Sequence, residues 1–336
     1  MSRATIKDLA KKLGVSPSTI SRALSDHPDI SENMKEKVRL VAEELNYTKN
    51  RRASGLRKNE SNIIALIIPE INMFFMPELI YGVNLEAEKS GLSVAIFQSD
   101  NSLEKEKELL KYCLEMSFCG VLLCLSVETK NLSHIDKITK KEMPVVLLDK
   151  VLNTQNYSTI TIEDELAGYQ AAEYLHQKGH SSILSIFGNP DLSITNLRKD
   201  GFNKALQSFT DFPSKHISLE IENILSLDSE LERILTSNKN ISAIFCMSDE
   251  LLVNTHHLLM RMEYKIPEQI SLLSISDGFV PYYLYPNISH LHHSGFEVGV
   301  VAVNELLENQ TDNPNHINVK TKLFEMESVK EFYKAD

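Results

Sequence analysis

The sequence lacks tryptophan and is poor in glycine, and these shortages exclude several kinds of site. Its 12 glycines never stand closer than four positions apart, which excludes a G-x-G-x-x-G nucleotide motif, and no G-x-x-x-x-G-K-[ST] phosphate loop occurs in the sequence. No G-x-S-x-G or H-E-x-x-H motif is present either. Three histidines, His290, His292 and His293, cluster near an expected strand, where ordinary strand or interface histidines are favoured over metal ligands. We therefore expect no enzyme, no cofactor and no bound metal.

Cysteine is also scarce, and no long apolar run occurs. The four cysteines form no C-x-x-C pair and three of them stand in apolar stretches, which indicates buried free thiols in a reducing cytosol. No window approaches the roughly 18 consecutive apolar residues that a membrane span needs. The N-terminal segment MSRATIKDLAKKLG lacks the apolar core of a signal peptide. We expect a cytoplasmic protein.

The chain has 336 residues, a length that suggests two or three folding units. Charged side chains are distributed unevenly along it. Residues 1–60 hold 13 Lys and Arg against 8 Asp and Glu, a net charge of +5. The remaining residues hold 22 basic against 38 acidic side chains, a net charge of −16. A basic segment ahead of an acidic one is what a separate phosphate-binding module would produce.

The first 48 residues carry the signals of three short helices. Thr5 is a favourable N-cap with Asp8 three residues later, and Gly14 is suited to the tight turn that ends the first helix. Ser16 can cap a second helix whose first position is Pro17, where a missing N–H costs nothing. Apolar residues follow at helical spacing in all three segments. They are Ile6, Leu9, Ala10 and Leu13 in the first and Ile20, Ala23 and Leu24 in the second. In the third, which starts at the Ser31 cap, they are Met34, Val38, Val41 or Ala42, and Leu45.

The outward face of the second segment carries Ser18, Thr19, Ser21 and Arg22. Small hydroxyl side chains allow close approach to a base edge or a phosphate, and Arg22 can donate two parallel hydrogen bonds to guanine. Two helices joined by a glycine-containing turn, with a third as support, form the helix-turn-helix pattern. A plain three-helix bundle with a solvated face is the alternative.

Residues 46–62 are polar and basic, which a simple linker would explain. Ala53 and Leu56 nevertheless stand three apart on one helical face, flanked by four basic residues. Ser54 and Gly55 are poor helix formers, so a helix here is expected only when phosphates neutralise the basic side chains. Leu56 would then be an apolar wedge in the minor groove of DNA.

The residues beyond 62 alternate between short apolar runs and helical stretches. The runs are IIALIIP, SVAIF, GVLLCL, PVVLL, ILSIF, SAIFC and ISLLSI, and the helical stretches are 76–90, 103–117, 164–178, 194–209 and 248–262. This repeated βαβ pattern predicts an α/β fold with a parallel sheet that is covered on both faces.

Ligands of such sheets bind at the carboxyl ends of the strands. The polar and aromatic residues that follow the predicted strands include Glu70, Asn72, Phe74, Phe75, Asp149, Lys150, Arg198, Ser248, Asp249, Glu250, Ser276 and Asp277. Polar residues end strands in most proteins, and Ser and Asp are common helix caps. Only the whole set indicates a site for a small polar ligand.

The head closely resembles the lactose-repressor/galactose-repressor (LacI/GalR) family of transcription regulators. The matching elements are T-I-x-D-L-A, G-V-S-x-x-T-I-S-R, the E-L-N-Y end of the third helix and N-x-x-A-x-x-L. The resemblance implies a homodimer on a near-palindromic DNA operator. It implies base contacts by Pro17, Ser18 and Arg22, a minor-groove wedge at Leu56 beside Ala53, and DNA-backbone contacts by Thr5, Ser16, Thr19, Ser21, Ser31, Tyr47 and Asn50.

The rest of the chain resembles the same family more loosely, through F-F-x-x-E-L-I-x-G at 74–82, K-G-H at 178–180, R-x-x-G-F at 198–202, S-D-E at 248–250, I-P-E-x-I-S-L at 266–272 and E-S-V at 327–329. The resemblance implies two Rossmann-like lobes of the periplasmic-binding-protein type, joined by three crossovers, with an effector between them. The implied effector contacts are Phe75, Asp149, Arg198, Ser248, Ser276 and Asp277. The family carries Asp where Ser276 stands.

We therefore expect a helix-turn-helix domain at 1–48, a hinge helix and linker at 49–61, and an effector-binding and dimerisation domain at 62–336. Its first lobe would comprise about 62–162 and 290–320, and its second about 163–289 and 321–336. The expected function is repression of transcription under control of a sugar or sugar derivative. A transport or chemotaxis binding protein and a cytosolic sugar-modifying enzyme are the alternatives, and the first would need export while the second lacks a catalytic constellation.

Overall fold

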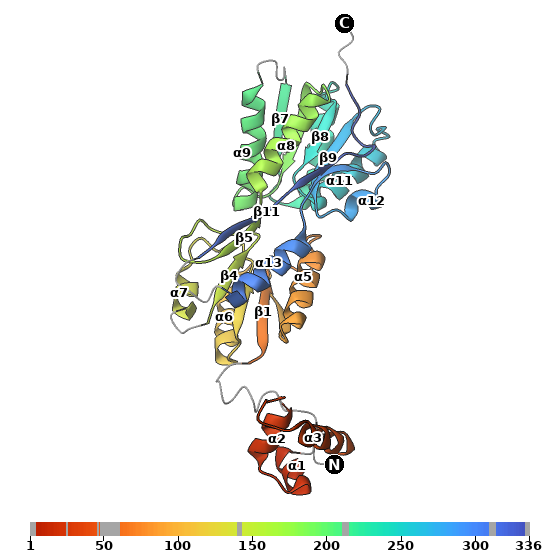
Figure 1. The fold of residues 1–336 in the computed structure, drawn as a ribbon. Helices are drawn as coiled ribbons and strands as arrows, with labels where there is room; N and C mark the ends of the chain where they lie inside the picture. The colour runs from red at the N-terminus through yellow and green to blue at the C-terminus, as the bar shows by residue number, and fades with distance from the viewer. Residues whose placement is uncertain are drawn as a thin grey trace. The chain divides into compact units, whose positions relative to one another are not determined.

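The computed structural model describes residues 5–24, 26–45, 47, 61–139, 143–209, 215–308 and 314–332. The chain divides into two units, Met1–Ser61 and Asn62–Asp336, which we call the head and the body (Figure 1). The predicted hinge, residues 49–61, lies outside the described residues except for Ser61.

The head is built from three helices, α1 (Ile6–Leu13), α2 (Pro17–Leu24) and α3 (Glu32–Glu44). They pack around the apolar stripes that the sequence predicts: Leu9, Ala10, Ile20, Ala23, Val38 and Ala42 are buried together. Burial of these side chains is the main force that holds so small a unit together.

The predicted caps of α1 and α2 are present, whereas Ser31 stands at the N-cap position of α3 without a side-chain hydrogen bond. The Asp8 carboxylate accepts hydrogen bonds from the backbone N–H of Thr5 at 2.8 Å and from its hydroxyl at 2.7 Å. Gly14 ends α1 with a φ of 66°, a conformation that glycine adopts without steric cost. Ser16 Oγ accepts from the backbone N–H of Thr19 at 3.1 Å and so caps α2.

The body contains two six-stranded sheets. The first has the order β11-β5-β4-β3-β1-β2, and every neighbouring pair is parallel. Its strands are β1 (Ile63–Ile68), β2 (Ser93–Gln98), β3 (Gly120–Leu123), β4 (Val145–Leu148), β5 (Thr159–Ile162) and β11 (His316–Val319). The helices of this lobe are α5 (Met76–Lys89), α6 (Leu103–Glu115), α7 (Ser133–Thr139) and α13 (Gly295–Glu308).

The second sheet has the order β12-β10-β9-β8-β6-β7 and is parallel except for the β10–β12 pair. Its strands are β6 (Ser182–Phe187), β7 (Lys215–Glu220), β8 (Ala243–Cys246), β9 (Ser271–Ser276), β10 (Ser289–His292) and β12 (Lys322–Phe324). Its helices are α8 (Asp164–Gln177), α9 (Ser193–Ser208), η1 (Ile224–Ser226), α10 (Leu227–Ser237), α11 (Asp249–Arg261) and α12 (Val280–Tyr283).

The chain passes between the lobes three times: from β5 to α8, from β10 to α13 and from β11 to β12. Two Rossmann-like lobes with three crossovers are thereby confirmed, and Figure 1 shows them one above the other. The expected lobe boundary near residue 290 falls inside β10, and the crossover itself follows His292.

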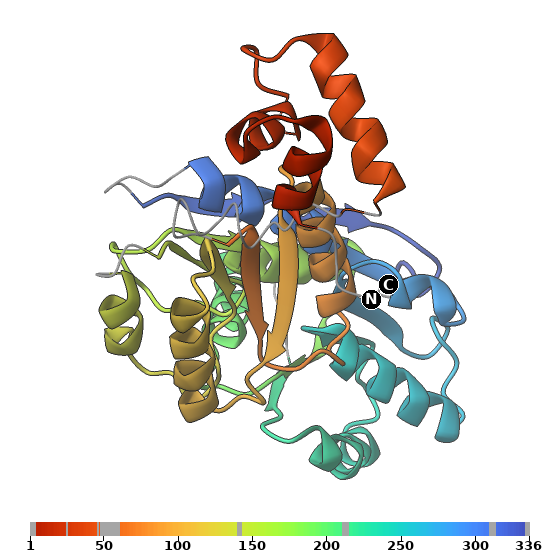
Figure 2. The same cartoon turned by 90° about the horizontal axis from the view of Figure 1, so that it is seen from below.

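Alternate side chains of β1 point to opposite faces of the first sheet. Ile64, Leu66 and Ile68 pack in one apolar cluster with α5 and α13, whereas Ala65 and Ile67 pack in another with α6 and α7. Figure 2 shows α5 and α6 on opposite sides of the strands. A strand buried on both faces is continuously apolar, which is why the run IIALIIP has no polar alternation.

Two helix pairs cross at very short range because glycines face the neighbouring backbone. A Cβ at Gly168 of α8 would lie 2.0 Å from the Arg198 carbonyl oxygen, and one at Gly201 of α9 would lie 1.8 Å from the Glu165 carbonyl oxygen. In the other lobe, a Cβ at Gly82 of α5 would lie 2.2 Å from a backbone oxygen of α13. Glycine is therefore required where these helices touch.

All five predicted helical stretches are confirmed to within two residues at each end. Several elements were not predicted, namely α7, α10, α12, α13, β5, β7, β11 and β12, whereas the strand expected near His290 is present as β10. None of the helices in the described part of the chain combines the length and apolar character that a membrane span requires. Cys113, Cys124 and Cys246 are buried free thiols, and burial raises the pKa of Cys113 and of Cys246 to about 12.

Gly201→Ala is expected to destabilise the body, because the added Cβ would collide with a backbone carbonyl of α8. Overpacking of this kind costs about 1–3 kcal/mol, and only a separation of α8 from α9 relieves it. Urea unfolding of the full chain should show a lower midpoint. Gln207→Ala, an exposed position on the same helix, serves as the control and should leave the midpoint unchanged. Equal midpoints for the two variants would contradict the close crossing.

Candidate functional site

The exposed face of the head is centred on the N-terminal turn of α2. Ser16 and Thr19 are joined by a hydroxyl–hydroxyl hydrogen bond of 2.9 Å, and Pro17 and Ser18 are exposed beside them. The backbone N–H groups of a helix N-terminus attract anions, so this turn is suited to a phosphate.

Arg22 extends from the last turn of α2 and has 59% of its side chain exposed. Its nearest charged partner is Asp29, whose carboxylate lies 4.0 Å away and is itself 66% exposed. An exposed ion pair at this distance is worth little and is easily exchanged for another partner. The guanidinium is therefore available to a ligand in front of α2.

The predicted DNA-contacting residues fall into three groups. Exposed residues are Thr5, Ser16, Pro17, Ser18, Arg22 and Ser31, and half-buried ones are Thr19, Ser21 and Tyr47. The Tyr47 ring packs against the apolar core of the head. Asn50, Ala53 and Leu56 lie outside the described residues. All these contacts with DNA stay predictions.

In the body, Arg198 of α9 is buried, with 4% of its surface exposed. Its Nε donates a hydrogen bond of 2.7 Å to Asp164 Oδ1, and its Nη1 donates one of 2.7 Å to the Met247 carbonyl. Asp164 begins α8 and Met247 follows β8. One guanidinium thus joins three elements at the carboxyl edge of the second sheet.

Acidic and imidazole groups surround this guanidinium. Burial raises the pKa of Asp164 to about 6, although the nearby Arg198 acts in the opposite direction. Burial likewise raises the pKa of Asp149, which Lys150 and Arg198 partly offset. His293 is held in its neutral form, because burial and the Arg198 charge keep its pKa well below the usual value. These groups are electrostatically coupled and therefore form one cluster.

Phe75 provides the apolar side of the cluster. Its ring centroid lies 5.2 Å from that of His293, in a tilted arrangement. Of the six predicted effector contacts, Asp149 interacts with the Arg198 charge, and Phe75 packs on His293, which interacts with the same charge.

Three buried polar atoms of the cluster have no hydrogen-bond partner: Thr195 Oγ1, Asp249 Oδ1 and His293 Nδ1. Thr195 precedes Arg198 by one helical turn, and both Asp249 and His293 interact with the Arg198 charge. A buried polar atom without a partner is costly, so such a group of atoms indicates a place for a polar ligand.

The other three predicted effector contacts have partners within the protein. Ser248 caps α11, its Oγ lying 3.5 Å from the Leu251 N–H. The Ser276 Oγ accepts from the Gly278 N–H at 3.0 Å. Asp277 accepts from the Gly295 N–H at 2.8 Å, at the start of α13. Their roles as effector contacts stay predictions.

The sequence did not indicate Asp164, Thr195 and His293 as members of the cluster, and it did not single out Asp249. Asp164 follows β5, whose four residues TITI are too short to mark a strand by themselves. Asp249 stood in the set of residues that follow strands, but nothing in the sequence distinguishes it from an ordinary first residue of a helix. Within the described ranges, no group of three His, Cys, Asp or Glu side chains is arranged to hold a metal ion.

The lobes touch beyond the crossovers: the Phe74 and Phe279 ring centroids are 5.8 Å apart, and Asp277 accepts from the Gly295 N–H of α13. Two further polar contacts form what we call the lobe clamp. The backbone N–H of Phe74, after β1, donates to Glu250 Oε1 of α11 at 3.1 Å. Lys130 of the first lobe lies 3.2 Å from Asp191 of the second, and both side chains are more than half exposed.

Two family models match the chain. Residues 5–50 match the bacterial regulatory proteins of the lacI family. Residues 61–311, well over half of the chain, match the periplasmic binding proteins and sugar binding domain of the LacI family. The chain belongs to the LacI family.

Relatives in this family align with almost the whole chain. The chain is 27% identical over 326 residues to the HTH-type transcriptional repressor PurR of Aliivibrio salmonicida, with 96% of each protein covered. It is 27% identical over 327 residues to the ribose operon repressor of Haemophilus influenzae, again with 96% of each covered.

A solved structure of the lac repressor dimer bound to operator and the anti-inducer ONPF has the same fold, with a TM-score of 0.85 at 19% identity, and covers 98% of this chain and 100% of that one. The LacI-family chain described here is a DNA-binding transcriptional regulator with an effector-binding body. The comparisons favour this function over a transport protein or an enzyme.

Asp164→Ala is expected to destabilise the body strongly, because it leaves the Arg198 charge buried without its carboxylate. Loss of one partner of a buried ion pair costs roughly 3–5 kcal/mol, which urea unfolding of the full chain would measure. Asp164→Asn keeps an acceptor oxygen for Arg198 Nε and should lose less.

Asp191→Ala, which removes the exposed partner of Lys130, is the matched control and should cost about 0–1 kcal/mol. If Asp164→Ala cost no more than Asp191→Ala, the pair would not organise the site.

Proposed function

We propose that this LacI-family regulator is a repressor that binds a near-palindromic operator as a homodimer, in the cytoplasm, under control of a sugar or sugar derivative held between its two lobes. The observation that carries the proposal is the unsatisfied polar cluster around Arg198, in a chain whose head presents an exposed Arg22.

The head supports operator binding by shape and charge. The exposed side chains of α2 are small except for that of Arg22, so α2 can lie close to the base pairs of a major groove. The net charge of +5 over residues 1–60 favours phosphate contacts in a chain that is acidic overall.

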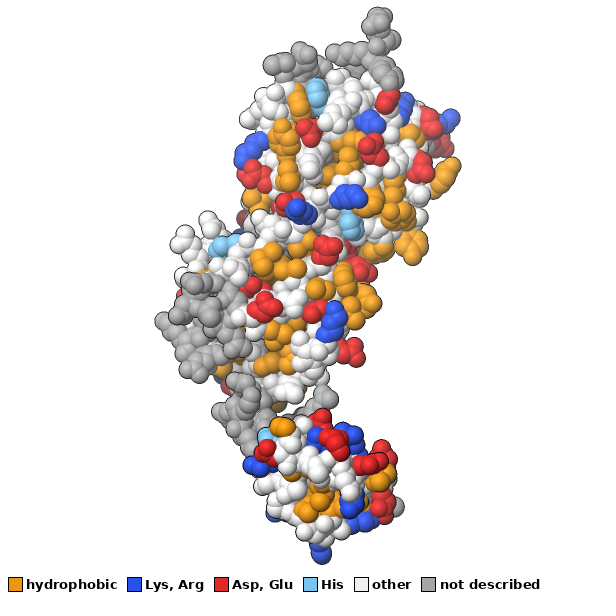
Figure 3. Space-filling model, in the orientation of Figure 1, with side chains coloured by type: hydrophobic (Ala, Val, Ile, Leu, Met, Phe, Trp, Pro, Cys, Tyr) orange, Lys and Arg blue, Asp and Glu red, His pale blue; other side chains and the backbone are white. Residues whose placement is uncertain are grey.

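An exposed apolar surface supports the dimer. Leu225 of η1 is 85% exposed, Tyr285 is 88% exposed, and Met260 of α11 is 41% exposed. Tyr285 is held to this helix, since its carbonyl oxygen lies 3.0 Å from His256 Nε2. Figure 3 shows hydrophobic side chains gathered on the flank of the body where α11 and α12 lie. Apolar side chains that gather on a surface mark interfaces.

The chemistry of the cluster supports a sugar. Hydroxyl groups both donate and accept hydrogen bonds, so they can satisfy Asp249 Oδ1 and His293 Nδ1 while also accepting from the Arg198 guanidinium. Phe75 presents one aromatic ring, which is enough to cover the apolar face of a sugar. A purine, the ligand class suggested by the name of the PurR relative, would be favoured by stacking between two rings.

Arg22→Ala is expected to reduce operator discrimination, because a bidentate contact to guanine is worth about 1–3 kcal/mol. The measurement is a gel-shift titration of the full chain on an operator selected from a random near-palindromic library, repeated at several salt concentrations. Wild-type affinity should fall steeply with salt.

Arg39→Ala is the matched control, since Arg39 lies on α3 and is 62% exposed, against 59% for Arg22. It should weaken binding to all sequences by the same small factor. Equal discrimination by both variants would refute base recognition by Arg22, and the absence of any sequence preference at any salt would refute operator binding.

A thermal-shift screen of the full chain against sugars, sugar phosphates and nucleobases tests the effector class. A ligand at one hundred times its Kd stabilises the folded state by about 2.7 kcal/mol. We expect the unfolding temperature to rise with at least one sugar or sugar phosphate and not with purines. Stabilisation by a purine alone would replace the proposed effector class.

A further inference from the structure

Lys150, which follows β4, is a buried lysine whose ammonium has no oxygen partner. It is 6% exposed, and within the described ranges its Nζ has one hydrogen-bond contact, 3.7 Å from Met73 Sδ, and no ion pair. An ammonium carries three N–H donors, whereas a thioether is a weak acceptor. Burial of such a charge without a good acceptor is costly, so this side chain indicates a place for an acceptor that the protein itself does not supply.

The ammonium borders the cluster around Arg198. Met73 stands two residues before Phe75, which forms the aromatic side of that cluster. Asp149, the neighbour of Lys150 in sequence, interacts with the charges of both Lys150 and Arg198. Lys150 belongs to the first lobe, whereas Arg198 on α9 belongs to the second. Two cations from opposite lobes therefore act on one region of the body.

The two cations differ in their partners. Arg198 Nε donates to Asp164 at 2.7 Å, so a carboxylate balances its charge. Lys150 forms no ion pair with Asp149, and burial raises the pKa of Asp149 in spite of both cations. Glu250 already accepts from a backbone N–H of the first lobe at 3.1 Å. A balancing negative charge is therefore present beside Arg198 and missing beside Lys150.

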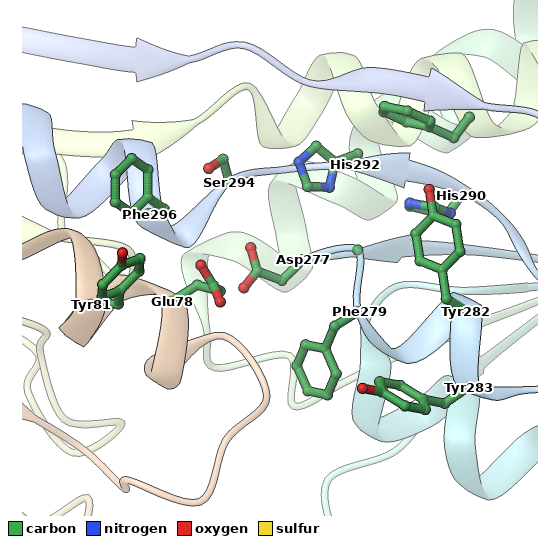
Figure 4. A pocket seen from close by; sticks show the side chains of 12 residues that line it. Glu78, Tyr81, Asp277, Phe279, Tyr282, Tyr283, His290, His292, Ser294 and Phe296 are labelled. Atoms are coloured by element: carbon green, nitrogen blue, oxygen red, sulfur yellow. The ribbon is translucent and has the colours of Figure 1, made fainter.

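The depression beside α5 and α12 offers no alternative place for a negative charge. Figure 4 shows the Asp277 and Glu78 carboxylates turned toward each other there. No lysine or arginine is among its lining residues. An anion would be repelled by both carboxyl groups, and the buried cation of the first lobe lies elsewhere.

We propose that the effector carries an oxyanion, a phosphate ester or a carboxylate, and that Lys150 binds it. This inference rests on the sugar site proposed above and names the class of sugar derivative. The hydroxyls of the ligand complete the cluster around Arg198, its apolar face covers Phe75, and its oxyanion accepts from Lys150 Nζ. A charge-assisted hydrogen bond is about twice as strong as one between neutral groups. Lys150 therefore selects the charged derivative over the parent sugar.

The same contact bears on regulation. The oxyanion binds the first lobe through Lys150, while the hydroxyls of the same molecule bind the second lobe near Arg198. A ligand favours the conformation in which it makes more contacts. The charged derivative therefore favours the arrangement of the lobes in which both cations reach it, and the parent sugar, which lacks the contact to Lys150, does so less.

The test is isothermal titration calorimetry of the full chain with sets of sugars that differ in charge. The sets are glucose, glucose 6-phosphate and glucuronate; galactose, galactose 6-phosphate and galacturonate; and ribose with ribose 5-phosphate. Inorganic phosphate is titrated as the oxyanion alone. In at least one set we expect a charged member to bind at least about tenfold more tightly than the parent sugar. The phosphate ester and the uronate of a set then distinguish the two oxyanions.

Substitutions at Lys150 assign the preference. Lys150→Met removes the charge and keeps an unbranched side chain, so the charged and parent members should bind about equally. Lys150→Gln keeps N–H donors without the charge and should lose most of the preference, whereas Lys150→Arg should retain it. Lys107→Met, at a 43% exposed lysine on α6 of the same lobe, is the matched control and should leave the preference unchanged.

Unfolding in urea separates ligand binding from a structural role of Lys150. Because the charge is buried without an ion pair, Lys150→Met should leave the midpoint unchanged or raise it. A lower midpoint together with an unchanged preference would show that Lys150 serves only to balance Asp149, and would overturn the proposal. If Lys150→Met fails to fold, Lys150→Gln and Lys150→Arg still decide the question.

Tighter binding of the parent sugar in every set would overturn the inference and leave the proposed sugar site intact. A preference for the charged member that Lys150→Met and Lys150→Gln both retain would also overturn it, since the oxyanion would then bind elsewhere, as at the N-terminus of α2. Binding of inorganic phosphate that is lost in Lys150→Met, without binding of any sugar, would support the oxyanion site and refute the sugar. If neither phosphate nor any sugar binds, both proposals fail.

Discussion

The buried ion pair between Arg198 and Asp164 is the interaction around which the ligand-binding part of the body is organised. Its desolvation cost is high, and a buried ion pair seldom adds net stability. Its effect is to fix geometry: α8 starts at the first crossover, and the 2.7 Å contact holds that start against α9 and the end of β8. The pair forms only because Gly168 and Gly201 let the two helices touch backbone to backbone.

This arrangement explains why the site is polar and incompletely satisfied. Arg198 donates from Nε to Asp164 and from Nη1 to the Met247 carbonyl. Burial and the Arg198 charge both lower the pKa of His293. For Asp149 and Asp164, burial raises the pKa and the Arg198 charge partly offsets that rise. The groups that surround it cannot all be satisfied by one another. A ligand rich in hydroxyls completes the set, because each hydroxyl can serve as donor on one side and acceptor on the other.

Much of the fold could be predicted from local signals. The head follows from Thr5, Gly14, Pro17 and the apolar stripes, since caps and periodicity act within a few residues. The unpredicted strands lack that kind of signal: β7, with the sequence KHISLE, is a polar edge strand, and β12 has only three residues. Helix α13 is rich in valine and glycine, a composition more typical of a strand than of a helix. Its helical form is evident only from its packing on α5.

The site was predictable only in part, for a different reason. Phe75, Asp149 and Arg198 follow strands that the sequence reveals, so the rule for parallel sheets places them at one edge. Asp164 and His293 join them through the crossovers, and a crossover is a long-range feature that no local pattern records. Asp249 follows β8, but the sequence does not distinguish it from an ordinary first residue of a helix.

The lobe clamp is the weak, exposed part of the contact between the two lobes. It consists of one backbone-to-carboxylate hydrogen bond from Phe74 and one ion pair, Lys130–Asp191, whose members are 58% and 66% exposed. Such contacts together amount to roughly 1–4 kcal/mol, comparable to the preference of a typical effector for one conformation over another. The lobe clamp therefore restrains the lobes only weakly, and an effector with a modest preference for one arrangement of the lobes can outweigh it.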